Sequence, residues 1–146
     1  MVIIEIKIWF LSALGFIGGG LVALLGGWDV ALTALIILMG VDYLTGILVA
    51  GVFKASPKSE CGSLESKAGF KGMVRKGCML LIVLVAVQLD LVLNTDIVRS
   101  FSIIAFCANE VISIIENAGL MGIRIPTVIT NAIELLNEKS GGSSND

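Results

Sequence analysis

Apolar residues are concentrated in four runs that are separated by short polar segments. The runs cover residues 8–25, 30–53, 77–93 and 97–118. A helix of about 20 apolar residues crosses the hydrocarbon core of a bilayer, which is about 30 Å thick, so each run predicts a transmembrane helix. The turn at 26–29 is so short that the first two helices must be antiparallel. The pattern predicts an all-α integral membrane protein whose four transmembrane helices form two hairpins.

The fourth run differs from the others because it carries a polar stripe. Its polar side chains recur at near 3.5-residue spacing or lie beside those positions: Ser102, Asn109, Glu110, Ser113, Glu116 and Asn117. Lipid cannot satisfy such a face, which predicts the wall of a pore or a polar contact between subunits. The same pattern is typical of an amphipathic helix that lies in the membrane interface with its polar face in water. Three spans plus an interfacial helix therefore remain the alternative to four spans.

Asp42 is the only charged residue in the second run. A carboxylate at this depth costs roughly 2.5–3.5 kcal/mol on insertion scales and usually marks an internal contact, a water-filled path or a proton site. Thr45 and Gly46 share its helical face, where the Thr45 hydroxyl can satisfy the carboxylate. Two interpretations stay open: a residue that controls assembly or gating, and a hydrogen-bonded packing residue.

Residues 54–76 form the one long polar segment and hold six of the ten basic residues. By the positive-inside rule this segment is cytoplasmic, and four spans then place both chain ends in the cytoplasm. Some of its basic residues have helical spacing or directly follow it: Lys67, Lys71, Arg75 and Lys76. This spacing predicts a helix on an anionic lipid surface. The alternative is a solvated loop that only fixes the topology.

Two further segments carry helical signals. Small residues at four-residue spacing form a ridge on the first helix, at Gly15, Gly19 and Ala23. Such a ridge permits close helix packing and suits oligomerisation. Beyond the fourth run, an amphipathic pattern predicts a short helix over residues 126–138, and the polar residues 139–146 predict a disordered tail.

Composition narrows the class of protein. Hydrophobic residues make up 56% of the chain and charged residues only 15%, against about 25% charged in a soluble domain. The chain has no histidine, and its three cysteines lack the spacing of metal ligands. Neither a zinc site nor a His-based catalytic triad is predicted. We therefore expect a protein that is not an enzyme and has no cofactor, metal or nucleic-acid partner.

Three separated motifs resemble one family. They are Gly-Val-Asp-Tyr-Leu-Thr-Gly at 40–46, Glu-Ser-Lys-Ala-Gly-Phe-Lys-Gly-Met-Val-Arg-Lys at 65–76, and Asn-Glu-Val-Ile-Ser-Ile-Ile-Glu-Asn-Ala-Gly-Leu-Met-Gly-Ile-Arg-Ile-Pro at 109–126. In this order, over residues 30–138, the chain resembles the phage holins of the toxin-secretion and phage-lysis type. The polar motif residues of that family correspond here to Asp42, Thr45, Gly46, Lys67, Lys71, Arg75, Lys76, Asn109, Glu110, Ser113, Glu116 and Asn117.

The resemblance implies a non-enzymatic protein of phage or prophage origin that accumulates in the bacterial cytoplasmic membrane. There it would assemble as a homo-oligomer into a non-specific pore that lets an endolysin or a large toxin leave the cytoplasm, which triggers lysis. Its partners would be further copies of the chain, anionic lipid, and the endolysin or toxin without necessarily direct contact, with an antiholin as a further candidate. Two alternatives stay open. One is a small ion or solute channel or transporter subunit, although the two hairpins share no visible internal repeat, and the other is an antiholin-type regulator.

Overall fold

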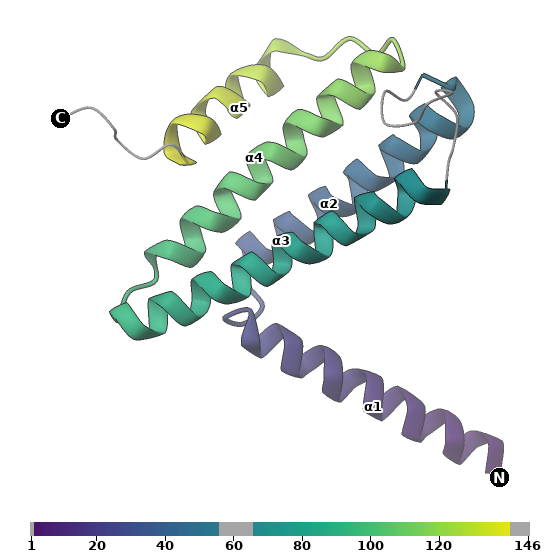
Figure 1. The fold of residues 1–146 in the computed structure, drawn as a ribbon, viewed down its shortest axis with the longest axis vertical. Helices are drawn as coiled ribbons and strands as arrows, with labels where there is room; N and C mark the ends of the chain where they lie inside the picture. Colours follow the sequence, from purple (N-terminus) through teal and green to yellow (C-terminus); the bar gives the residue numbers. More distant parts are fainter. Residues whose placement is uncertain (1, 56–65, 141–146) are drawn as a thin grey trace.

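Helices account for nearly all of the structure. The computed structural model describes residues 2–55 and 66–140, with side chains as far as Leu135 (Figure 1). Its elements are α1 (Val2–Leu24), α2 (Val30–Leu48) with a π-helical continuation η1 (Val49–Phe53), α3 (Ser66–Leu93), α4 (Ile97–Leu120) and α5 (Thr127–Ser140). Four helices, α1, α2 with η1, α3 and α4, are each long and apolar enough to cross a membrane. The predicted all-α membrane fold is confirmed, whereas homo-oligomeric assembly stays a prediction.

Helix α3 begins earlier than the apolar pattern indicated, at Ser66 rather than at residue 77. The basic residues from Lys67 onward therefore lie on the first turns of a continuous helix. Two glycines in these turns, Gly69 and Gly72, each cost up to about 1 kcal/mol in a helix. No proline interrupts the segment, and extending an existing helix avoids the cost of a new nucleus.

The C-terminal helix and the remaining polar segments are only partly described. Helix α5 begins directly after Pro126, whose carbonyl accepts a bond from the Ile129 amide at 3.0 Å, and it ends at Ser140. The predicted tail began at residue 139, and helix ends commonly shift by a residue or two. The rest of that tail and residues 56–65 of the basic segment lie outside the described residues.

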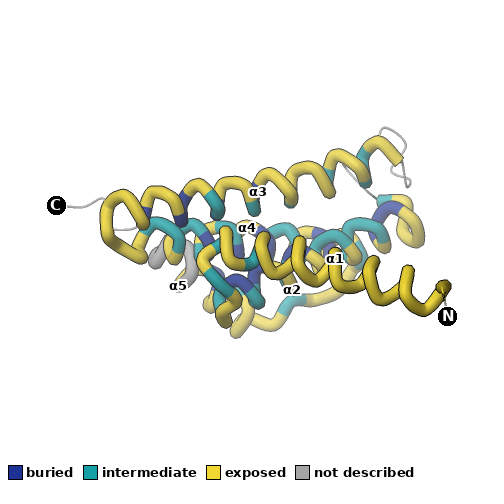
Figure 2. The backbone as a smooth tube through the Cα atoms, turned by 90° about the horizontal axis from the view of Figure 1, so that it is seen from below, coloured by how far each residue is buried: buried dark blue, intermediate teal, exposed yellow. Residues whose placement is uncertain are grey.

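Helices α2, α3 and α4 form the packed unit of the fold. Its core is built from residues that recur at i and i+4 on each helix: Leu35, Met39, Met79, Val83, Ile103 and Cys107. Figure 2 shows the buried segments of the chain within these helices. Between lipid-exposed helices the driving force is close van der Waals packing, because lipid tails are as apolar as these side chains. Shape matching of three apolar stripes therefore brings α2, α3 and α4 together.

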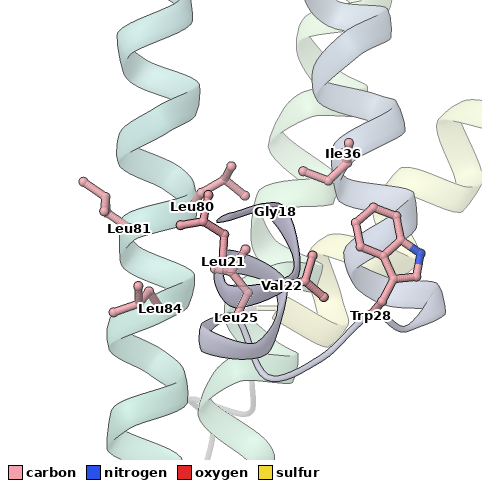
Figure 3. A pocket seen from close by; sticks show the side chains of 9 residues that line it. All are labelled: Gly18, Leu21, Val22, Leu25, Trp28, Ile36, Leu80, Leu81 and Leu84. Atoms are coloured by element: carbon pink, nitrogen blue, oxygen red, sulfur yellow. The ribbon is translucent and has the colours of Figure 1, made fainter. Parts of the chain in front are cut away.

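Helix α1 extends away from this unit (Figure 1), and none of its residues is buried (Figure 2). The predicted packing ridge is open, since a Cβ added at Gly15 or Gly19 would meet nothing within 4 Å. Only the end of α1 approaches α2 and α3, around an apolar cleft of about 290 Å³ (Figure 3). The cleft is lined by Gly18, Leu21, Val22, Leu25, Trp28, Ile36, Leu80, Leu81 and Leu84. The ridge therefore packs on no helix of the described chain, and its role in oligomerisation stays a prediction.

The turn between α1 and α2 depends on two glycines and a capping carboxylate. Gly26 and Gly27 have φ angles of +85° and +91°, a left-handed conformation that is strained for other residues. Asp29 then caps α2, because its carboxylate accepts a bond from the Leu32 amide at 2.8 Å. The chain changes direction here within a few residues, but α1 then extends away from α2 and does not pack along it as in a closed hairpin (Figure 1).

Alanine substitutions at the two glycines should have unequal effects. Both impose the left-handed penalty, about 1–2 kcal/mol. At Gly26 the new Cβ would also lie 2.7 Å from Nε of Arg99, whereas at Gly27 it would meet nothing within 4 Å. Gly26→Ala should therefore lower the free energy of unfolding in detergent micelles more than Gly27→Ala does. Equal losses for the two variants would contradict the close approach of Arg99.

Hydrogen bonds to a buried carboxylate stabilise the turn between α3 and α4. The carboxylate of Asp90, only 6% exposed, accepts bonds from the Thr95 hydroxyl at 2.6 Å and from the amides of Val98 and Arg99 at 3.0 and 2.8 Å. These amides belong to the first turn of α4, which has no bond from the side chain of its own N-cap residue, Asp96. Asp90 thus caps the following helix, and its burial is compensated by three donors.

Candidate functional site

Three helices each contribute one charged residue to a buried contact. The Lys76 ammonium on α3 donates to the Asp42 carboxylate on α2 at 2.8 Å. It also forms an ion pair with the Glu110 carboxylate on α4. The side chains of Lys76, Asp42 and Glu110 are 15%, 13% and 4% exposed, so all three lie largely inside the α2–α3–α4 unit.

Uncharged polar groups extend this contact along α2. The Asn117 amide on α4 donates to the Asp42 carboxylate at 3.2 Å and to the Thr45 hydroxyl at 3.0 Å. The Thr45 hydroxyl in turn donates to the Asp42 carbonyl at 3.0 Å. Gly46 faces the same amide, since a Cβ there would lie 3.8 Å from its nitrogen, an ordinary van der Waals contact. We call Asp42, Thr45, Lys76, Glu110 and Asn117 the Lys76 cluster.

The Lys76 cluster lies within the depth of the hydrocarbon core. Asp90 lies near the end of α3, and we take it as the level of one face of the hydrocarbon core. At 1.5 Å per residue, Lys76 is about 21 Å along α3 from Asp90, which is less than the thickness of the core, about 30 Å. Isolated charges at such depth are costly, and a buried ion pair offsets that cost only where further hydrogen bonds satisfy its members. The bonds from Asn117 to Asp42 and Thr45 are of this kind. The cluster therefore holds charged groups of α2, α3 and α4 away from lipid.

The polar stripe of α4 is divided between the inside and the outside of the unit. Glu110 and Asn117 are buried, at 3% and 5% exposure, whereas Asn109 and Glu116 are exposed. Residues on the outer side of the stripe are exposed or half-buried, and we call them the open polar edge: Ser102, Asn109, Ser113 and Glu116. The Ser102 hydroxyl is satisfied within α4 by the Val98 carbonyl at 2.7 Å. Asn109 lies about 15 Å along α4 from Arg99, near the middle of a bilayer core.

A second charged contact ties the two turns together at the other end of the unit. The Arg99 guanidinium donates to the Asp29 carboxylate at 2.6 Å, to the Leu25 carbonyl at 2.7 Å and to the Gly27 carbonyl at 3.3 Å. We call this contact the Arg99 clasp. It fastens the end of α1 and the start of α2 to the first turn of α4. The missing Cβ of Gly26 is what admits the Arg99 side chain.

Comparison with known proteins identifies the family. Residues 19–138 match the model of the bacteriophage holin family. This chain belongs to the bacteriophage holin family. It is 37% identical over 131 residues to an uncharacterized protein of Listeria innocua, which covers 88% of each chain. It is 36% identical over 118 residues to an uncharacterized 14.9 kDa protein of Clostridium perfringens (78% and 82% of the two chains), and 33% identical over 106 residues to a probable holin of Bacillus phage phi105 (72% and 73%). No solved structure matches the chain.

Membership in the holin family and four apolar helices make this chain a multi-pass membrane protein. The motif residues that suggested the family meet in the structure: Asp42 and Thr45 from the first motif, Lys76 from the second, and Glu110 and Asn117 from the third. Other motif residues lie elsewhere. Lys67, Lys71 and Arg75 are exposed on α3. The described residues contain no group of three or more His, Cys, Asp or Glu side chains that could hold a metal ion.

Sequence reasoning grouped Lys76 with the surface residues and missed its place in the cluster. Lys76 follows the i, i+4, i+8 row of Lys67, Lys71 and Arg75 by one residue, which is about 100° around the helix. That offset was a usable signal that Lys76 faces another side. The Arg99 clasp was not predicted from the sequence. The acidic residue in the short turn at 26–29 and the arginine near the start of the fourth apolar run were the available signals.

In this holin the Arg99 clasp makes a testable contribution to stability in acid. The hydrogen bond from Arg99 lowers the pKa of Asp29 below its usual value of 3.8. Because the folded pKa is the lower one, the ionised carboxylate stabilises the fold above the unfolded pKa, and this contribution is lost as pH falls through the folded pKa. Asp29→Asn keeps a good helix cap but removes the charge. Its free energy of unfolding in micelles should fall less steeply below about pH 4 than that of the natural chain, and identical slopes would contradict the ion pair.

Proposed function

We propose that this chain assembles with further copies of itself in the bacterial cytoplasmic membrane and opens a non-specific pore. The pore releases an endolysin, or a large toxin, from the cytoplasm and so triggers lysis of the host. Membership in the bacteriophage holin family supports this function. The identity of 33% to a Bacillus phage protein named as a probable holin supports it as well.

The observation that carries the proposal is the open polar edge of α4. Asn109 is exposed near mid-bilayer depth, and Glu116 is exposed two turns further along the same edge. Hydrocarbon cannot accept or donate a hydrogen bond, so amide and carboxylate groups at this depth need protein or water as partners. An oligomeric pore supplies both, because the edge then borders a neighbouring copy and the water between copies.

A pore must form between copies, since the interior of one α2–α3–α4 unit is filled. Leu35 and Val83 are fully buried and Ile103 is 1% exposed. These side chains occupy the centre of the unit, where a channel through a single chain would run. Repeating one contact about a rotation axis closes a ring of copies. The diameter of such a ring grows with the number of copies and can reach that of a folded enzyme.

The Lys76 cluster has a separate role in the proposal. It stabilises the chain in the state that waits in the membrane, where Asp42 and Glu110 are paired with Lys76 instead of facing lipid. The α2–α3–α4 unit then enters the oligomer as one body, and the open polar edge supplies the contact between copies. Asp42 contributes to assembly through the unit it holds together.

The basic end of α3 fits the inner surface of the cytoplasmic membrane. At 1.5 Å per residue, Lys71 and Lys67 lie about 29 and 35 Å from Asp90, at and beyond the edge of a 30 Å core. Both are exposed, so we assign them to anionic headgroups. The chain extracted from bilayers of equal parts phosphatidylglycerol and phosphatidylcholine should retain mainly the anionic lipid in native mass spectrometry. A Lys67→Gln/Lys71→Gln variant should lose this preference, and its absence in the natural chain would refute the assignment.

Expression in a bacterium tests the function. Induction of the chain should stop growth abruptly and collapse the membrane potential, and an endolysin expressed with it should then lyse the culture. An ion-selective channel would collapse the potential without releasing the endolysin. That outcome, or normal growth at high expression, would contradict the proposal.

A further inference from the structure

We propose that Glu116 on the open polar edge of one copy pairs with Arg75 on α3 of a neighbouring copy. Helix α4 of each copy then packs against α3 of the next. This inference rests on the proposed oligomeric pore and specifies the contact that builds it.

Both side chains lack a partner among the described residues. Glu116 and Arg75 are exposed, and neither takes part in any ion pair or side-chain hydrogen bond among the residues that the structure describes. Three charged residues deeper in the unit behave differently, since Asp42, Lys76 and Glu110 are paired internally. Exposed charges at membrane depth are costly, so a contact that pairs them is favoured.

The two residues also lie at nearly the same depth. The Arg99 amide donates to the Asp90 carboxylate at 2.8 Å, so these residues mark a common level at the ends of α4 and α3. At 1.5 Å per residue, Glu116 is about 26 Å from Arg99 along α4, and Arg75 is about 23 Å from Asp90 along α3. Lys67, at about 35 Å, is too far from that level. Depth thus selects Arg75 and excludes Lys67.

Lys71, about 29 Å from Asp90 along α3, differs in depth from Glu116 by about as much as Arg75 does, but in the opposite direction. The surroundings of Lys71 and Arg75 differ. Lys71 is at the edge of the 30 Å core, where water and headgroups reach its ammonium, whereas Arg75 is inside the core. A guanidinium also binds a carboxylate with two parallel hydrogen bonds and loses less hydration than an ammonium. Arg75 is therefore the residue that gains most from Glu116.

The contact is of the head-to-tail kind that builds rings. It joins a patch on α4 to a different patch on α3, so each copy has one of each patch free for the next copy. Such a head-to-tail contact forms a ring when its rotation closes. Asn109 shares the open polar edge with Glu116 and comes to lie at the same seam, where the neighbouring copy and water satisfy its amide.

A charge exchange tests the pairing. The full-length chain is reconstituted in vesicles of phosphatidylcholine alone, which removes anionic headgroups as partners of Arg75, and release of a trapped folded fluorescent protein is measured. Arg75→Glu and Glu116→Arg should each slow release at least about tenfold, the effect of 1.4 kcal/mol. The double variant Arg75→Glu/Glu116→Arg should recover most of the rate. The matched control Lys67→Glu/Glu116→Arg has the same total charge and should not recover.

Disulfide crosslinking gives a second readout that does not depend on pore activity. In chains whose Cys61, Cys78 and Cys107 are replaced by alanine, Arg75→Cys in one tagged copy should crosslink to Glu116→Cys in another. Recovery in the exchange variant together with this crosslink supports the pairing. Recovery in both double variants, recovery in neither, or no crosslink would overturn it. Failure of the natural chain to release the protein would instead refute the proposed function.

Discussion

Replacing Lys76 with methionine should lower the free energy of unfolding by about 3–5 kcal/mol, the usual cost of removing one partner of a buried ion pair. Lys76 bridges the carboxylates of Asp42 and Glu110. Its replacement leaves both carboxylates inside the unit without the positive charge of the ammonium. Methionine keeps the flexible apolar stem and removes the ammonium. The measurement is an SDS titration of the purified chain in mixed micelles, followed by circular dichroism.

Two comparisons separate the ion pair from a general effect of losing a lysine. Lys71 is exposed on the same helix, so Lys71→Met should change the free energy of unfolding by less than about 0.5 kcal/mol. In the Lys76→Met background, Asp42→Asn together with Glu110→Gln should recover most of the loss, because neutral amides leave no charge unpaired. A loss below about 1 kcal/mol for Lys76→Met would mean that the bridge behaves like a surface salt bridge.

Asn109→Leu should slow pore opening and leave the chain at least as stable as before. Asn109 is exposed near mid-bilayer depth, where leucine is preferred on insertion scales. A hydrogen bond between helices in a membrane is worth about 0.6 kcal/mol on average and up to about 1.7. Because the lost contact recurs at every seam of a ring, release of a folded protein from vesicles should slow at least about tenfold.

Gln88→Leu is the matched control, since Gln88 is an exposed amide on α3 and lies about 220° around that helix from Arg75. It should leave the release rate unchanged. The two variants bury no new group, so the SDS titration should show no loss of stability in either. Equal rates for Asn109→Leu and the natural chain would show that the open polar edge takes no part in assembly.

The spans could be predicted from the sequence because bilayer thickness sets their length. Runs of about 20 apolar residues have few alternatives to a membrane helix. The short turn at 26–29 predicted an antiparallel first hairpin, but α1 extends away from the α2–α3–α4 unit (Figure 1). The start of α3 was harder to predict, since charged and glycine residues obscure a helix that continues beyond the hydrocarbon core. Hydropathy indicates which residues lie in the hydrocarbon core, but it does not indicate where the helix ends.

The sequence predicted which residues belong to the candidate site, but not which of them are buried or which contact one another. Glu110 and Asn117 are seven residues apart, as are Asn109 and Glu116, so both pairs fit the same helical spacing. They differ by one residue, about 100° around α4, and only the packing of α2 and α3 decides which pair is inside. Lys76 shows the same limit, because its contacts with Asp42 and Glu110 join residues of three different helices.

Release from liposomes shows whether copies of this chain alone build a pore wide enough for a folded protein. Vesicles are loaded with both a small dye and a folded fluorescent protein, and the purified chain is added at increasing ratios to lipid. Both cargoes should leave together above a threshold ratio, with a steep dependence on the amount of chain. Release of the dye alone, or release that rises in simple proportion to the chain, would contradict it.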